Sequence, residues 1–522
     1  MDTQQRDGRI QPLADSCRRL WDALEPARKR VRSRFTIDTR ALAALRIALG
    51  SIILFDLLQR AAYIDVFYTD NGVHSVAAYE TTYSQYTGLS LHAASGELWF
   101  QQFMFALAGL FALALILGYR TRLVGFVSLV LVFSLHARNP ALLNGGDRLL
   151  RVLLLVALLT PLGERWSIDA LRRGSARTSV VSFGTVALLA QPLAVFASNA
   201  YLKHGGESWY AGEAVRIALA NDVMTVYLGN HLSAYPSLLE AFNWAWILLL
   251  TGSIAFLLLT DGRTRAFFAL VYIGSFAGML VSLSVGLFPF VLTASVIPYL
   301  TAPFWDALAR PIPSRWLDRR PTAAQLGPLG RPPVERRALD RLQRNGYESL
   351  ASFTVEFGRS LVTVAGVLAI VWIVLFSASY AAGVDVPDEI DHTHVDQQKW
   401  GLYAPDPSES YGWYVVEAEL ETGESVDAFR GGNVTMDRPP DASQEYDTFR
   451  HRKYMSLVRD SGREDTLDIV AEEYADWACV QANAEHDGQV EQVTVYRLIQ
   501  SSPIDGEYED DPNHYTVIER DC

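Results

Sequence analysis

The sequence of 522 residues is poor in cysteine, lysine and charge. It has three cysteines, Cys17, Cys479 and Cys522, which excludes a small secreted scaffold held together by many disulfides. Lysine occurs four times, so almost all of the 45 basic residues are arginines. Charged residues make up only 20% of the chain and apolar residues 50%. This composition excludes a disordered chain and is typical of an integral membrane protein.

The charge is distributed unevenly along the chain. Residues 381–522 contain 33 acidic and 10 basic side chains, whereas residues 1–380 have a net charge of +10. The basic excess lies in loops between apolar stretches, so we expect no nucleic-acid partner. A strongly acidic, lysine-poor exterior is similar to that of proteins from salt-loving archaea, in which molar salt screens carboxylate repulsion. A codon bias toward arginine is the alternative explanation.

Nine apolar stretches approach the length of a membrane span. They cover residues 41–63, 98–118, 121–136, 147–163, 179–201, 239–260, 266–284, 286–303 and 360–381. Several are short, which favours tilted or broken helices that are buried in protein. The sequence therefore predicts a mainly α polytopic protein with about nine transmembrane helices, whose first partner is the lipid bilayer.

Arginine and lysine concentrate in alternate loops, which predicts a cytoplasmic N-terminus and a C-terminus outside the cell membrane. Five segments follow from this topology. They are a cytoplasmic N-terminal segment (1–35), a transmembrane bundle (36–303), a cytoplasmic loop rich in arginine and proline (304–358), a final transmembrane helix (359–381) and an acidic extracytoplasmic α+β domain (382–522).

Alternating apolar residues predict strands in the last of these segments. We expect strands over 411–420, 492–499 and 515–520, and a helix over 465–483. The alternation in the first strand places four side chains on one face: Tyr414, Val416, Ala418 and Leu420.

The cysteines and one acidic run raise questions that the sequence leaves open. Cys479 and Cys522 would both lie outside, where they either pair or remain apart, whereas Cys17 would be cytoplasmic and reduced. Residues 388–396 contain a His-x-His pattern among acidic residues. We interpret this run as a solvated linker, because no second ligand cluster accompanies it. We therefore name no metal ligands, and whether the protein binds a metal stays open.

Ionisable residues inside a predicted span are functional candidates by default, because burying them in lipid is costly. The first span contains Arg46, Asp56 and Arg60. Asp56 and Arg60 are one helical turn apart and are expected to pair. Arg46 lies about 15 Å further along the axis, so its partner must come from another element. A purely structural role for all three is the alternative.

A polar connection separates the third and fourth predicted spans. It begins near His136 and Arg138, continues through Asn144, and ends at Asp147 after two glycines. Asp147 is placed to cap the following helix through its backbone N–H groups. We favour capping over catalysis for Asp147, and we regard Arg138 and Asn144 as candidate ligand-binding residues.

Lys203 is the only lysine between Lys29 and Lys399. In a chain that uses arginine almost everywhere, a retained lysine indicates that an amine is needed. A desolvated lysine can lose its proton and act as a base, which arginine cannot do. His204 and Glu207 are close enough in sequence to tune it. The alternative is a cation that extends to the lipid headgroups.

These segments resemble the HTTM (horizontally transferred transmembrane) domain family, which is related to vitamin K-dependent γ-glutamyl carboxylase. The resemblance covers most of residues 36–470, and its strength lies in the order of the motifs. They are Leu45-Arg46-Ile47 with Asp56, Tyr68 to Gly72, Gly118 to Arg122, Arg138 to Asp147, Lys203 to Trp209 with Gly212, and Gln398 to Pro407.

The resemblance implies a carboxylase-like membrane fold and chemistry. In the carboxylase, a quinol is oxidised to an epoxide, the strong base so generated removes a proton from glutamate, and CO2 adds to the carbanion. Lys203 matches the lysine that deprotonates the quinol, although its spacing to Trp209 is one residue longer. The histidine that the carboxylase uses after its third span is absent at the matching place, and His136 lies earlier. Quinol deprotonation is therefore implied more strongly than carboxylation.

We therefore predict an outward-facing site with Lys203 as base, His204 and Asp147 as polar partners and Trp209 as a pocket wall. Asn144, Arg138, Arg46 and Asp56 are further candidate ligand-binding residues. Menaquinone or a related quinol is the expected ligand, and the acidic domain would recognise or present a polypeptide.

Two other functions are consistent with the sequence. One is a non-enzymatic scaffold or receptor whose outer domain binds a partner. The other is a transporter, although the inverted repeats found in many transporters are not detectable.

Overall fold

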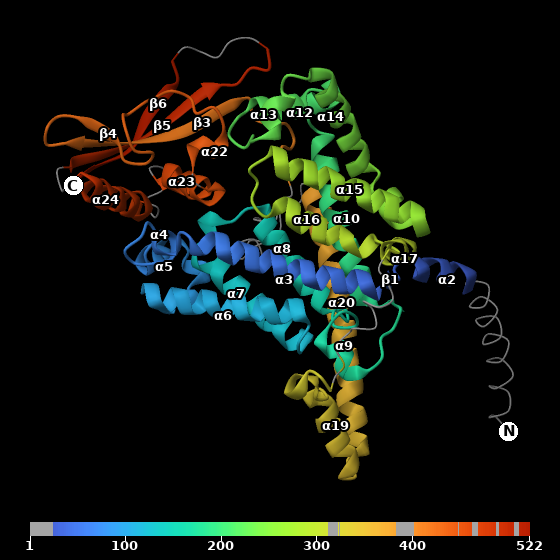
Figure 1. Ribbon diagram of the computed structural model, residues 1–522. Coiled ribbons are helices and arrows are strands. Elements are labelled where there is room, and N and C mark those ends of the chain that lie inside the picture. Colours follow the sequence, from blue (N-terminus) through green and yellow to red (C-terminus); the bar gives the residue numbers. More distant parts are fainter. Residues whose placement is uncertain are drawn as a thin grey trace, which may run out of the picture.

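The computed structural model describes residues 25–311, 322, 324–382, 401–446, 448–461, 468–486, 490–505 and 511–522. Figure 1 shows a bundle of helices with a smaller sheet-containing domain at one end. Cys17 and the acidic run 388–396 lie outside the described residues, as does part of the motif 398–407.

Six helices in the described part of the chain are long and apolar enough to cross a membrane. They are α3 (Thr39–Ala61), α6 (Leu98–Leu117), α7 (Thr121–Arg138), α10 (Phe183–Lys203), α15 (Gly262–Ser282) and α20 (Glu348–Ala382), the last over 348–375. The chain is thus a multi-pass membrane protein, but the predicted count of nine spans is not confirmed.

The three other predicted spans are shorter or broken helices. The first is α8 (Gly145–Leu158), which has only 14 residues. The second is α14 (Pro236–Thr251), followed by the π-helical turn η4 (Ile254–Leu259). The third runs through α16 (Phe288–Val296) and η5 (Ile297–Tyr299), and then bends by 100° into α17 (Ala302–Ala309). If this bent pair is counted as one span, the described part of the chain has seven candidate spans.

Short elements connect the long helices. Those between α3 and α10 are α4 (Ile64–Tyr68), α5 (Val76–Thr82), η1 (Ser84–Tyr86), η2 (Leu91–Ala94), η3 (Pro140–Leu142) and α9 (Ile168–Arg173). Those between α10 and α14 are α11 (Glu207–Ala211), α12 (Ala214–Ala220) and α13 (Leu228–Leu232). At the far end lie α2 (Glu25–Arg34), η6 (Gly327–Gly330), α19 (Val334–Arg344) and the small sheet of β1 (Ile37–Asp38) with β2 (Ser179–Val180).

The turn between α6 and α7 requires a glycine at position 118. Gly118 ends α6 in a left-handed conformation with φ of 65°. A Cβ atom added to Gly118 would lie 2.5 Å from the Arg46 guanidinium and 2.3 Å from Ser167 Cβ. Only glycine fits here, because both the backbone conformation and the close approach of Arg46 exclude a side chain.

The C-terminal domain has an antiparallel sheet in the order β4-β3-β5-β6. Its strands are β3 (Ser410–Leu420), β4 (Ser425–Asp427), β5 (Val490–Ser501) and β6 (Asn513–Asp521), and its helices are α22 (Ala442–Glu445), α23 (Phe449–Ser461) and α24 (Asp468–Glu485). The predicted strands and helix are confirmed, and α22, α23 and β4 are additional elements. The four side chains predicted to share one face of β3 are all buried in the same core.

Cys479 and Cys522 form a disulfide, so the two cysteines pair and do not remain apart. It joins the middle of α24 to the end of the chain after β6, across 43 residues. Helix α23 lies between this sheet and the bundle, close to α3 and α8 in Figure 1. The domain thus contacts the membrane helices through α23.

Candidate functional site

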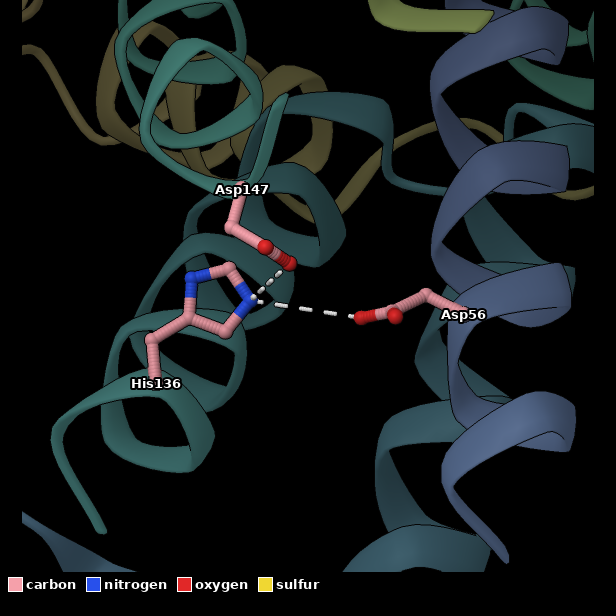
Figure 2. A group of neighbouring side chains, drawn as sticks. All are labelled: Asp56, His136 and Asp147. Atoms are coloured by element: carbon pink, nitrogen blue, oxygen red, sulfur yellow. Dashed lines mark ion pairs between the residues drawn. The ribbon is translucent and has the colours of Figure 1, made fainter. Parts of the chain in front are cut away.

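A cluster of buried polar side chains lies where the C-terminal domain meets the bundle. Asp56 comes from the second half of α3, His136 from the end of α7 and Asp147 from the first turn of α8, and Figure 2 shows that all three point toward one another. His136 Nε2 lies 3.6 Å from Asp147 Oδ1 and 3.9 Å from Asp56 Oδ2. The fold therefore brings His136 to Asp147, although eleven residues separate them in sequence.

Two arginines neutralise the carboxylates of this cluster. Arg60 donates to Asp56 Oδ2 at 2.9 Å, to Asp147 Oδ1 at 2.8 Å and to the Tyr68 hydroxyl at 2.6 Å. Arg450, on α23, donates to Asp147 Oδ1 at 3.0 Å and also forms an ion pair with Asp56. The predicted pair of Asp56 and Arg60 is confirmed. Two carboxylates and two guanidinium groups balance each other, which a buried cluster requires.

Asp147 takes part in capping α8, but the N-cap residue is Asn144 and Asp147 is the third residue of the helix. Its Oδ2 accepts the Asn144 backbone N–H at 2.8 Å, while Asn144 Oδ1 accepts the N–H groups of Gly146 and Asp147 at 2.8 and 3.3 Å. This reciprocal capping box holds the carboxylate in one orientation. Asn144 is thus a partner of Asp147, and its side-chain amide additionally donates to the Val285 carbonyl at 2.7 Å.

The chemistry of the donors argues against a metal ion in this cluster. Ligand atoms of Asp56, His136 and Asp147 lie within 4.8 Å of one another, which is close enough to share an ion. However, Arg60 and Arg450 already occupy the carboxylate oxygens. A divalent ion would have to displace two buried guanidinium groups, so we assign no metal here.

Arg138 and Arg46, the two arginines among the predicted site residues, donate hydrogen bonds to backbone carbonyls. Arg138 is fully buried and donates to the His74 carbonyl at 2.9 Å. Arg46 lies toward the opposite end of α3 and donates to the Trp166 and Ile116 carbonyls at 2.5 and 3.1 Å. Its partners come from other elements, as expected, and they are carbonyl groups at a helix end and a turn. Arg46 is therefore separate from the cluster around Asp56.

Lys203 is the last residue of α10 and is only 2% exposed. Its Nζ donates to the carbonyls of Leu402 and Tyr403 at 2.9 and 2.8 Å. The same atom lies 3.6 Å from the centroid of the Trp209 ring, and Trp209 Nε1 donates to the Tyr403 carbonyl at 3.1 Å. The structure therefore places Lys203 against Trp209, with residues 401–403 folded over both.

His204 faces away from this arrangement. Its Nδ1 lies 2.5 Å from the Tyr210 hydroxyl and its Nε2 lies 2.9 Å from the Thr251 hydroxyl. The predicted site residues thus fall into two main groups, one around Lys203 and Trp209 and the other around Asp56 and Asp147.

A large cavity of about 570 Å³ lies beside Lys203. Its walls are mostly apolar side chains of α10 and of α12 to α16, and Lys203 and Trp209 lie on its boundary. Three further polar residues line it: Asn199, Ser275 and Ser282. Gly274 and Gly278 of α15 also line it, and no heavy atom lies within 4 Å of the position that a Cβ would take on either residue. These glycines leave room for a ligand.

Sequence reasoning missed Arg450, because nothing marked α23 as a contact of the bundle. A signal was nevertheless present. Residues 381–522 contain only ten basic residues, and three of them lie together as Arg450, Arg452 and Lys453. A basic group in an otherwise acidic domain indicates a buried partner of opposite charge or an anionic ligand.

Comparison with known proteins supports the resemblance seen in the sequence. The family model described as the HTTM domain matches residues 35–305, just over half of the chain. Neither a curated protein nor a solved structure matches. The matched region contains Lys203, Asp56, Asp147 and five of the six long apolar helices. The chain belongs to the HTTM domain family and is a multi-pass membrane protein.

Proposed function

We propose that this protein binds an isoprenoid quinol of the menaquinone type in the cavity beside Lys203, and that Lys203 acts there as a base. The observation that carries this proposal is a single amine on the boundary of a cavity of about 570 Å³ whose walls are otherwise mostly apolar. Ligand pockets of this kind combine an apolar lining with few, fixed polar groups.

The lining fits a flat ring that carries a long hydrocarbon chain. Phe242, Trp246 and Phe288 provide aromatic surface, and Gly278 leaves open space beside them. Aromatic side chains favour offset or edge contacts with a second ring. A quinol, when bound, supplies acidic phenolic hydroxyl groups and two electrons.

The surroundings of Lys203 accommodate both forms of its amine. A neutral amine has two N–H donors, which the carbonyls of Leu402 and Tyr403 match, and its lone pair remains to accept a proton. An ammonium group has a positive charge, which the face of the Trp209 ring stabilises. Lys203 can therefore take up a proton without a change in its hydrogen-bonding partners.

A second candidate function, a non-enzymatic scaffold or receptor, is favoured by the same contacts. Through Lys203, α10 is tied to residues 402 and 403, and through Trp209, α11 is tied to residue 403. A lysine in this setting also serves as a structural clamp. Under this alternative the positive charge is essential and proton transfer is not, so Lys203→Arg is tolerated.

The experiment that separates these functions uses the purified full chain in detergent and in liposomes. We expect mass spectrometry to detect a quinone with the wild type, and liposomes that contain menaquinol to show its consumption in air. Lys203→Arg should retain the quinone but lower the consumption by at least about 100-fold, because general-base catalysis contributes that much. Lys29→Met, which changes an exposed lysine of α2, is the control. Equal consumption by wild type and Lys203→Arg contradicts the base, and absence of quinone and of consumption contradicts the proposal.

A further inference from the structure

A second cavity, of about 290 Å³, lies between the start of α8, the segment before α16, and α23. Three cationic side chains line it: Arg148, Arg452 and Lys453. Within the described part of the chain, no acidic residue lines it. Asn144 and Gly145, at the N-terminus of α8, form another part of its wall.

The cations of α23 have contrasting partners. Arg450 is paired with Asp56 and Asp147. Arg452 instead donates to the carbonyls of Val223 and Ser284, the latter at 2.9 Å. Neither Arg452 nor Lys453 forms an ion pair with any described residue. Their positive charges are therefore not neutralised in the same way as that of Arg450.

Two carboxylates act on these cations from outside the cavity wall, Glu445 on Arg452 and Asp147 on Lys453, but both also have other partners. Asp147 is already matched by Arg60 and Arg450. Burial raises the pKa of Glu445, and this carboxyl group accepts a hydrogen bond from the Tyr411 hydroxyl at 2.9 Å. Burial together with the positive charges of Arg452 and Arg148 lowers the pKa of Lys453. Like charges in a half-buried space repel one another, and an anion between them would remove that cost.

We propose that this cavity binds a compact oxyanion, either a carboxylate or a phosphate group, between Arg148, Arg452 and Lys453. Arginine and lysine are the residues that hold such groups through charge-assisted hydrogen bonds. The inference does not depend on quinol binding. The two cavities adjoin, because Phe288 and Leu402 line both of them.

The test measures thermal unfolding of the full chain in detergent, without added quinol. Sodium acetate or inorganic phosphate is titrated against sodium chloride at equal ionic strength. For the wild type we expect a saturable rise in Tm of about 3 °C or more with at least one of the two anions. Lys453→Gln should lose this rise and Lys453→Arg should keep it. Arg459→Gln is the matched control, because Arg459 lies on the same helix and pairs with Asp460 instead.

A second arm distinguishes a free anion from a lipid headgroup. In nanodiscs of phosphatidylcholine the wild type should respond to the added anion. If the phosphate of an anionic lipid is the natural occupant, nanodiscs that contain phosphatidylglycerol, whose headgroup has a net negative charge, should abolish that response in the wild type. An unchanged response there identifies a free anion as the occupant.

The proposal is overturned if acetate and phosphate act no differently from chloride on the wild type. It is equally overturned if Lys453→Gln responds as the wild type does. Should Lys453→Gln fail to fold, Arg148→Gln is titrated by calorimetry with the same two anions, and unchanged affinity overturns the proposal.

Discussion

Arg450 of α23 and Asp147 of α8 form an ion pair of 3.0 Å, although 303 residues separate them in the sequence. Both side chains are buried. The same guanidinium group also pairs with Asp56 of α3. One side chain of the C-terminal domain thus completes the charge balance of a cluster inside the bundle.

Replacing Arg450 by methionine should destabilise the protein strongly. Asp56 and Asp147 would then share only Arg60, and breaking a buried ion pair costs about 3–5 kcal/mol. Chemical or thermal unfolding of the full chain in detergent measures this effect. Arg459→Met on the same helix is the control, since its pair with Asp460 is much more exposed and should contribute less than about 1 kcal/mol.

The charge balance itself can be tested by a double variant. Arg450→Met combined with Asp147→Asn removes one charge of each sign. It should recover part of the stability lost in Arg450→Met alone, because fewer buried charges are left unpaired. If the double variant loses at least as much unfolding free energy as the two single variants lose together, charge balance is not the reason.

Filling the large cavity should prevent ligand binding without unfolding the protein. A leucine at Gly278 would extend from a position whose Cβ has no neighbour within 4 Å. We expect Gly278→Leu to lower the amount of co-purified quinone by roughly tenfold, equivalent to about 1.4 kcal/mol of binding free energy. Gly358→Leu on α20 is the matched control, because its Cβ position is also open and it does not line the cavity. Equal quinone content in the two variants argues for another binding place.

The disulfide between Cys479 and Cys522 should stabilise the C-terminal domain. It closes a loop of 43 residues, and constraining the unfolded chain in this way typically contributes about 2–4 kcal/mol. Cys522→Ser should therefore lower the denaturant midpoint of this domain, whereas Cys17→Ser should leave it unchanged. Thiol labelling of the unfolded wild type should modify only one of the three cysteines unless a reductant is added.

Acid should destabilise the protein through His451. Burial among aromatic rings lowers the pKa of His451 to about 3, compared with 6.5 for a free histidine. The unfolded chain therefore binds a proton that the folded chain does not, and stability falls as the pH is lowered from about 6.5 toward 3. The full effect amounts to about 5 kcal/mol.

The variant that checks this dependence is His451→Leu. Its unfolding free energy should fall less steeply between pH 6.5 and 4 than that of the wild type. The control is His514→Leu, which replaces an exposed histidine of β6 in the same domain. If His451→Leu and His514→Leu show the same slope, His451 is not the group responsible.

Local sequence patterns predicted much of the fold. The alternation over 411–420 correctly placed Tyr414, Val416, Ala418 and Leu420 on one face of β3, because successive side chains in a strand point to opposite sides. It did not show that Tyr411, Trp413 and Val415 on the other face are buried as well, in a separate cluster. The pair of Asp56 and Arg60 and the capping role of Asp147 also follow from spacings of three or four residues. The count of nine spans is not confirmed, because three of the predicted spans are short or broken helices in the described part of the chain, as at the 100° bend after Tyr299. Apolar composition alone does not show where a helix ends.

The sequence by itself determined that this is a multi-pass membrane protein with an acidic α+β domain, and it singled out Lys203, Trp209, Asp56 and Asp147. Only the tertiary structure decided which of these meet. Lys203 obtains its carbonyl partners from residues 402 and 403, and Asp147 obtains its ion pair from Arg450. Contacts between residues about 200 and 300 positions apart depend on how whole elements pack, and no local pattern of residues encodes them.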